Sequence, residues 1–371
     1  MGFRGFNKFG AFYALSILSI SACGELPGFQ VGQKSDYGVQ SVEPIDFTDL
    51  DILFVVDNSG SMQQEQDNLA DSFESFINQF AERDLNFHIG VVSTDMTATS
   101  VSGWWQGTRA LDSGCTPAYR NIYNGGPGTL LSKYSAYKFL TPDVPDYITK
   151  FKNNVKLGTC GTGAETGILS AHSFLDTAKI SAGGYNEDFV RPDGFLAVIF
   201  LSDEDEGVSA EDTAYIKTKP TQRATRVNDF KARMTALKPG RPELLRVDAI
   251  VGRSYAECPT LHSSTSVGDV YMEVAAAMNG KSSNICQDFS SQLMGIGTQI
   301  LTFLTRFPLL QPPVNADVEV KVNGSVVPKD EVNGWVLVEE GGKYFVEFRG
   351  TAVPNNGDQI QITYVPSRPV G

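Results

Sequence analysis

The chain has 371 residues, of which 41% are hydrophobic and 20% are charged. This composition predicts a folded globular protein, and the length suffices for one α/β domain of ordinary size plus a smaller module. The formal net charge of −13 argues against nucleic acid as a partner, because phosphate binding needs a basic face.

The first residues have the features of a secretion signal. Arg4 and Lys8 precede an apolar run at 11–20, which is too short to span a bilayer as a helix. The following residues 20–23, ISAC, resemble the lipobox of bacterial lipoproteins. The resemblance implies that residues 1–22 are a signal peptide and that Cys23 is lipidated. The alternative is an ordinary signal peptide with a chance cysteine near its cleavage site.

The residues after Cys23 indicate where in the cell envelope the protein would be located. Gly24, rather than Asp, follows the cysteine, and by resemblance to the enterobacterial sorting rule this implies the outer membrane, on its periplasmic or surface side. Residues 23–48 are rich in Gly, Pro, Gln and Ser, and we expect a flexible tether there.

Four cysteines remain beyond Cys23, and an even number in an exported chain indicates disulfides. Three connectivities are possible. The pairs that join nearest neighbours, each closing one loop, are favoured: Cys115–Cys160 and Cys258–Cys286. A zinc site is the alternative, but no Cys-x-x-Cys pair is present and only His262 lies beside a cysteine.

Apolar runs alternate with amphipathic segments over most of the chain. We expect buried strands at 51–56, 87–93, 195–201 and 245–251. Helices are expected between or after them, through the stripe Leu69, Phe73, Phe76, Ile77 and Phe80, at 160–175, through Val227, Phe230, Met234 and Leu237, and at 267–278 and 286–307. This alternation predicts an α/β fold, with a mostly parallel, Rossmann-like sheet and helices on both faces.

Two regions depart from that pattern. Residues 95–158 contain Trp104, Trp105 and five tyrosines with little periodicity, and we interpret them as an insertion near one end of the sheet. Its aromatic residues serve either a local core or ligand binding. Residues 312–371 contain short apolar runs separated by turn signals such as Asn-Gly, and they predict a small β-rich module. Its strands are expected at 316–323, 335–340, 343–350 and 359–366.

Three polar loops carry the candidate chemistry. Asp57, Ser59 and Ser61 form the pattern Asp-x-Ser-x-Ser directly after the first apolar run. Thr162 lies in GTGAETG, five residues before a glycine that begins a helix, and Asp203 follows the run at 195–201. Open α/β sheets place ligand sites at the carboxyl ends of their strands, so we expect these loops to meet.

These residues, in this order, resemble the metal-ion-dependent adhesion site of von Willebrand factor type A domains over residues 49–307. The resemblance implies that Asp57, Ser59, Ser61, Thr162 and Asp203 surround Mg²⁺, with Mn²⁺ or Ca²⁺ as substitutes. It further implies that the sixth position is left for an acidic side chain of a protein partner. Neutral hydroxyl ligands suit that role, because they leave the positive charge of the metal largely uncancelled.

The sequence departs from the family pattern at one site residue and offers a competitor at another. Glu204 replaces the glycine that usually follows the second Asp, so the carboxylates of residues 203–206 compete for the metal. Thr166 is the competitor of Thr162.

Enzymatic motifs are missing from the sequence. No lysine follows the glycines of GTGAETG, no Gly-x-Ser-x-Gly is present, and His88, His172 and His262 are scattered. We therefore expect no catalytic residues and no enzyme. The leading expectation is an envelope lipoprotein that binds a protein partner through Mg²⁺. The alternatives are a metal-independent scaffold that uses the aromatic insertion or the β module, and, less favoured, a metal-dependent hydrolase.

Overall fold

The structure is a computed structural model of the chain. It describes residues 29–34, 37–42, 49–83, 85–96, 128–131, 137–159, 161, 165–207, 216–259, 267–355 and 358–367. The expected signal peptide, Cys23 and most of the aromatic insertion lie outside these residues.

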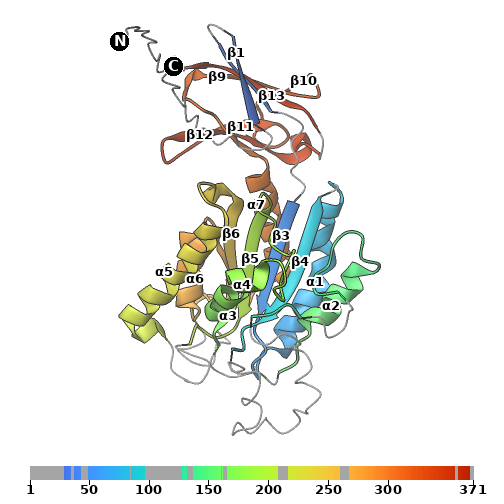
Figure 1. Cartoon of the computed structure of the whole chain (residues 1–371), viewed down its shortest axis with the longest axis vertical. Coiled ribbons are helices and arrows are strands. Elements are labelled where there is room, and N and C mark those ends of the chain that lie inside the picture. Colours follow the sequence, from blue (N-terminus) through green and yellow to red (C-terminus); the bar gives the residue numbers. More distant parts are fainter. Residues whose placement is uncertain are drawn as a thin grey trace, which may run out of the picture.

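A five-stranded parallel sheet forms the centre of the α/β part, in the order β4-β3-β5-β6-β7 (Figure 1). All neighbouring pairs run in the same direction. The strands are β3 (Asp49–Val56), β4 (Asn86–Ser93), β5 (Phe195–Ser202), β6 (Leu245–Val251) and β7 (Ser282–Asn284). The expected parallel sheet is therefore present.

Helices cover both faces of the sheet (Figure 1). Alternate side chains of β3 enter two separate cores, because successive strand residues point to opposite faces: Phe54 lies in one core and Val55 in the other. The first core includes residues of α1 (Gln63–Ala81), α2 (Tyr147–Val155) and α7 (Phe289–Leu304). The second includes residues of α3 (Gly167–Phe174), α5 (Pro220–Leu237) and α6 (Asp269–Ala277), while α4 (Thr177–Ile180) is one short turn.

The described parts of the insertion join the main core. Phe151 of α2 stacks on Phe73 of α1, with ring centroids 3.5 Å apart. Ile89 and Leu140 exchange two backbone hydrogen bonds of 2.8 and 2.9 Å, which cover the outer edge of β4. These residues extend the core of the sheet domain. The two tryptophans lie outside the described residues.

The β-rich module begins earlier than its proline boundary suggested. Helix α7 ends at Leu304, and β8 (Arg306–Pro308) already pairs with β12. The other strands are β9 (Pro313–Val322), β10 (Ser325–Val327), β11 (Trp335–Glu340), β12 (Lys343–Phe348) and β13 (Ile360–Pro366). Asn323 and Gly324, both with positive φ, form the tight turn between β9 and β10. The module thus consists of two small antiparallel sheets around a core that includes Phe307, Trp335 and Ile362.

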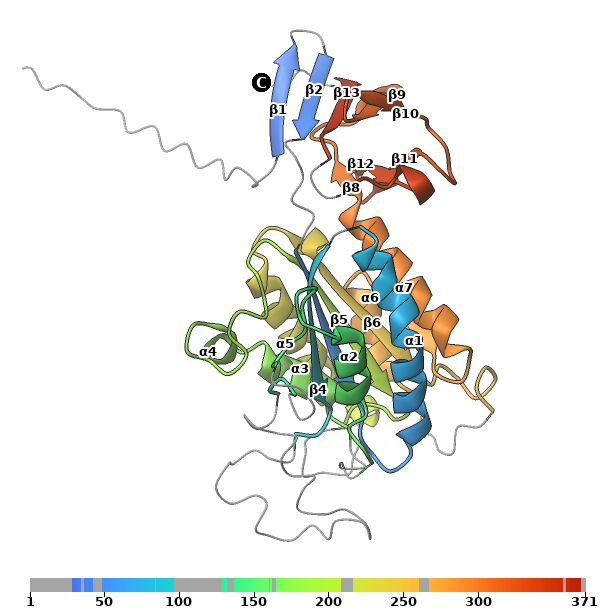
Figure 2. The ribbon, with the colours of Figure 1, turned by 90° about the vertical axis from the view of Figure 1, so that its right-hand side faces the viewer.

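Part of the segment expected to be a tether is folded into this module. Strands β1 (Phe29–Lys34) and β2 (Tyr37–Val42) form a hairpin, and β2 pairs with β13 (Figure 2). The pairing satisfies backbone groups on one edge of β13 that would otherwise lack a strand partner. Strands from the two ends of the chain therefore share one sheet, in the order β1-β2-β13-β9-β10.

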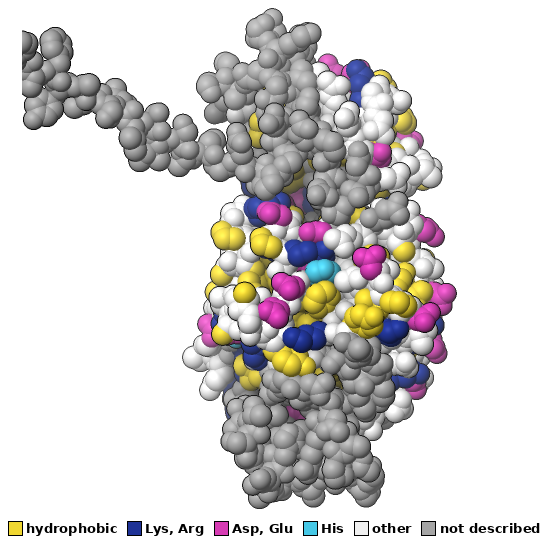
Figure 3. Space-filling view, turned by 45° about the vertical axis from the view of Figure 1, so that its right-hand side comes forward, with side chains coloured by type: hydrophobic (Ala, Val, Ile, Leu, Met, Phe, Trp, Pro, Cys, Tyr) yellow, Lys and Arg dark blue, Asp and Glu magenta, His cyan; other side chains and the backbone are white. Residues whose placement is uncertain are grey.

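The surface of the described residues carries charges of both signs. Figure 3 shows Lys and Arg interspersed with Asp and Glu on the face that it draws, with hydrophobic side chains between them. No helix in the described part of the chain has the length and apolar character required to cross a membrane.

Candidate metal site

The loop after β3 holds the first three candidate ligands on one tight turn. The N–H of Asp57 still donates to the carbonyl of Leu201, at 2.9 Å, so this residue stays fixed against β5. Its carboxylate accepts a 2.7 Å bond from the N–H of Ser59, and it is fully buried. The hydroxyl oxygens of Ser59 and Ser61 lie 3.4 Å apart. One carboxylate and two hydroxyls are therefore gathered where β3 ends.

The end of β5 brings Asp203 to the same place. Ser202, the last residue of β5, donates from its hydroxyl to the second carboxylate oxygen of Asp57 at 2.5 Å. Burial, and next the charge of Asp203, raise the pKa of Asp57 to about 7. The charges of Asp57 and Asp203 thus act on one another from loops after adjacent strands.

The last two carboxylates of the acidic run, Asp205 and Glu206, are engaged at helix N-termini. Glu206 accepts the N–H bonds of Ile168 and Leu169 at the start of α3, at 2.9 and 3.1 Å, and pairs with Arg226. Asp205 accepts the N–H of Val270 at the start of α6, at 3.0 Å. Anionic groups at these positions stabilise helix N-termini.

Gly161 lies against the loop after β3. The N–H of Gly161 donates to the carbonyl of Asn58 at 2.7 Å, and a Cβ at Gly161 would lie 2.5 Å from the side-chain oxygen of Asn58. Only glycine fits there. Thr162 itself lies outside the described residues. Its competitor Thr166 is buried, and its hydroxyl donates to the carbonyl of Thr94 at 2.9 Å.

Two further residues shape the site, and the sequence analysis did not single them out. Gln66 of α1 donates from its amide to the carbonyls of Asp57 and Gly158, and accepts the N–H of Gly158. Glu165 is fully buried and accepts the hydroxyl of Thr94. The only signal for Gln66 was a polar residue on the buried face of an amphipathic helix.

The buried carboxylates of the site repel one another. Burial, and then the charge of Asp57, raise the pKa of Glu165 well above its usual range. Its Oε1 has no hydrogen-bond partner within the described structure. Buried carboxylates that raise one another's pKa are stabilised in their charged form by a nearby positive ion.

The donor set determines which cation fits. The candidate ligands are carboxylate and hydroxyl oxygens, which suit Mg²⁺, Mn²⁺ or Ca²⁺ rather than zinc. Across the residues that the structure describes, no three His, Cys, Asp or Glu side chains are grouped as metal ligands. The hydroxyls of Ser59 and Ser61 would therefore be needed beside Asp57 and Asp203 to hold a metal.

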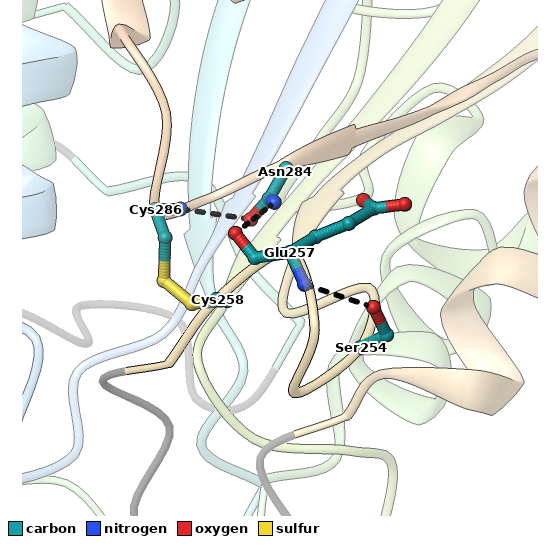
Figure 4. Close-up of a disulfide and its surroundings, with 5 residues drawn as sticks. All are labelled: Ser254, Glu257, Cys258, Asn284 and Cys286. Carbon is teal, nitrogen blue, oxygen red and sulfur yellow. Dashed lines mark hydrogen bonds between the residues drawn. A yellow bond between two sulfur atoms is a disulfide. The ribbon is translucent and has the colours of Figure 1, made fainter.

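A disulfide braces the neighbouring loop at the carboxyl end of the sheet. Cys258 follows β6 and is bonded to Cys286, which precedes α7, with Cα atoms 5.5 Å apart (Figure 4). The side chain of Asn284 accepts the N–H of Cys286 and donates to the carbonyl of Glu257, at 3.0 and 3.1 Å. This is one of the two pairs expected from the sequence. Cys115 and Cys160 lie outside the described residues.

Comparisons with known proteins give distant structural neighbours only. No family model and no curated protein sequence matches the chain. The pilus adhesin SpaC from Lactobacillus rhamnosus GG, in its open conformation, has a TM-score of 0.41 at 12% identity, over 91% of this chain and 42% of the adhesin chain. A second structure of the same adhesin has a TM-score of 0.38 at 11% identity, with the same coverage of both chains. Proximal thread matrix protein 1 from the mussel byssus has a TM-score of 0.36 at 13% identity, over 71% of this chain and 50% of that protein. The chain thus spans less than half the length of the adhesin.

Proposed function

We propose that this chain is an exported lipoprotein whose α/β part is a von Willebrand factor type A domain with a metal-ion-dependent adhesion site. The site would bind Mg²⁺, with Mn²⁺ or Ca²⁺ as substitutes, and would capture an acidic side chain of a protein partner. Lipidation at Cys23 would hold the protein at the cell envelope, in the outer membrane.

One observation supports this proposal above the others. The carboxylate of Asp57, directly after β3, is buried and fixed by two hydrogen bonds, and one of them comes from Ser202, the last residue of the adjacent β5. The proposed ligand set adds the hydroxyls of Ser59 and Ser61, 3.4 Å apart, and the carboxylate of Asp203, whose charge acts on Asp57. Asp205 and Glu206 are engaged at helix N-termini.

The roles of the residues follow from their positions. A bound divalent cation would supply the positive charge that attracts a carboxylate. The hydroxyls of Ser59 and Ser61 would be direct, neutral ligands. Asp57 and Asp203 would orient water and ligands around the ion. Gln66 fixes the main chain of Asp57 and thereby the direction of its carboxylate.

The primary test is calorimetric titration of Mg²⁺ and Mn²⁺ into soluble protein beginning at residue 24. We expect binding by the unmodified protein and its loss in Asp57→Asn, which keeps the shape of the side chain. Asp67→Asn, which removes an acidic charge from the surface of α1, is the matched control and should bind normally. Equal binding by Asp57→Asn and Asp67→Asn would refute the proposed site.

A second test concerns the partner. Cross-linking in envelope extracts should yield a partner adduct with Mg²⁺ present, and both chelation and Asp57→Asn should abolish it. An adduct that survives both treatments would instead favour the metal-independent scaffold. The β module would then be the first surface to examine, because Val326 and Val332 are exposed there, at 61% and 69%.

A further inference from the structure

The N-terminal hairpin lies on the covalent path between the proposed membrane anchor and the proposed metal site. From Cys23 the chain runs through β1 and β2, then through residues 43–48 into β3, which ends immediately before Asp57. We propose that this hairpin is an extension element, which opens under tension while the α/β domain stays folded. The proposal rests on the anchored, partner-binding role given above.

The strand register determines how the hairpin carries load. Phe29 pairs with Val42 at its open end, and Lys34 pairs with Tyr37 beside the turn. Tension enters the hairpin at Phe29 and leaves it at Val42, so both loaded residues lie at the same end. The hydrogen bonds between β1 and β2 are therefore loaded one pair after another, which is the weaker arrangement. Figure 2 shows the two strands side by side at the edge of the module, pointing in opposite directions.

Strand β3 meets the same tension differently. It pairs with β4 from Asp49 to Val56 and with β5 from Leu50 to Val56. Tension pulls β3 along its own axis between two neighbours, so the bonds of both ladders are loaded together. Its side chains are also buried on both faces of the sheet. The α/β domain should therefore resist a tension that opens the hairpin.

The β-rich module should stay folded when the hairpin opens. Strand β13 pairs with β9 as well as with β2, from Ile360 opposite Val322 to Tyr364 opposite Val318. The buried residues described for this core lie between Phe307 and Tyr364. Loss of the hairpin would leave this pairing and these contacts in place, so the hairpin could close again.

The length of the released segment gives a measurable quantity. Residues 29–42 would extend to about 45–50 Å, at about 3.3–3.6 Å per residue. The paired ends start about 5 Å apart, so opening should lengthen the path by about 40–45 Å.

The experiment is single-molecule pulling on soluble protein that begins at residue 23. Handles are attached through non-natural side chains at positions 23 and 63, the second at the exposed start of α1. We expect a reversible step of about 40–45 Å, at a lower force than the step that unfolds the α/β domain. The matched control moves the first handle to position 48, so that the hairpin lies outside the load path, and it should lack this step.

Two results would overturn the inference: no step before the α/β domain unfolds, or the same step in the control. The measurement needs neither metal nor partner, and it is run with Mg²⁺ and with a chelator. Its failure is therefore distinct from a failure of metal binding, which the calorimetric titration reports.

Discussion

At the residue scale, consecutive carboxylates after β5 have different roles, because each one contacts a different part of the fold. Asp205 and Glu206 accept N–H bonds from the first turns of α6 and α3. Asp203 is half-buried, and its charge acts on Asp57. The sequence correctly placed the acidic run after an apolar strand. It could not show which of the four carboxylates would act at the site, because that depends on the helices packed against this loop.

The different contacts of Asp203 and Asp205 predict different effects on metal binding for two matched variants. Asp203→Asn should weaken Mg²⁺ binding at least about tenfold, because it removes a group that orients the metal ligands. Asp205→Asn should leave metal affinity close to normal, because the carboxylate of Asp205 is engaged by the N–H of Val270 at the start of α6. Calorimetric titration of both variants checks this. Weaker binding in Asp205→Asn alone would reverse the assignment.

A second residue-scale prediction concerns Asp51, which lies near the start of β3, toward the end opposite Asp57. Asp51 is fully buried and accepts bonds from the main-chain N–H and the Nε of Arg191, at 2.8 and 2.7 Å. Burial outweighs the opposing charge of Arg191 and raises the pKa of Asp51 to about 6. Between about pH 4 and 6 the folded protein keeps a proton here that the unfolded chain has lost, so stability falls as the pH rises.

The expected contribution of Asp51 to this fall is about 2–3 kcal/mol. Asp51→Asn should have a flatter dependence of stability on pH over this interval, because residue 51 no longer titrates, while Arg191 keeps its 2.7 Å ion pair with Asp49. Urea denaturation of the parent and of Asp51→Asn at pH 4 and pH 6.5 measures how the free energy of unfolding of each depends on pH. Other buried carboxylates, such as Asp57 and Asp205, remain in the variant, so the difference isolates Asp51. Equal slopes would contradict the assignment.

At the element scale, apolar runs located the long strands but did not indicate several shorter elements, β7 and α2 among them. The runs at 51–56, 195–201 and 245–251 all lie within parallel strands, because a strand buried on both faces needs continuous apolar sequence. Strand β7 has the sequence SSN and gave no such signal. Helix α2 lies in the aromatic segment, and it is held by packing against α1.

The disulfide gives the element-scale prediction. Because Cys258 and Cys286 are 28 positions apart and tie the loop after β6 to the start of α7, the bond restricts the unfolded chain. Replacing both residues by serine should lower the free energy of unfolding by about 3–4 kcal/mol. Thermal and urea denaturation under oxidising conditions measure the loss. A double variant as stable as the parent would show that the bond is not formed or does not constrain the chain.

At the scale of the whole molecule, strand β2 from the N-terminal part of the described chain pairs with β13 from its C-terminal part (Figure 2). The Gly341-Gly342 turn correctly indicated the hairpin of β11 and β12, and the Asn323-Gly324 turn indicated the end of β9, since local turn chemistry sets a hairpin. The pairing of β2 with β13 joins residues more than 300 positions apart, from Ile360 opposite Val42 to Tyr364 opposite Gly38. No local sequence pattern predicts a pair of strands so far apart in the chain.

Removing residues 24–42 tests this arrangement. The shortened protein should keep Mg²⁺ binding, because the metal loops belong to the α/β domain, but it should expose one edge of β13. We expect faster amide exchange in β13 and concentration-dependent self-association, since an open strand edge pairs with other chains. Hydrogen-exchange mass spectrometry and size-exclusion chromatography report these changes. Unchanged exchange in β13 would show that β2 does not cover it.

The sequence by itself determined the parallel sheet, the two covered faces and the positions of Asp57, Ser59, Ser61 and Asp203 at strand ends. These features depend on hydrophobic periodicity and on polar residues at the ends of apolar runs, which are local properties. Only the tertiary structure decided which carboxylate of the acidic run acts on Asp57, that Gln66 holds the main chain of Asp57, and that the N-terminal strands complete the C-terminal sheet. Those outcomes depend on hydrogen bonds between segments far apart in the chain, and such partners are specified only once the chain has folded.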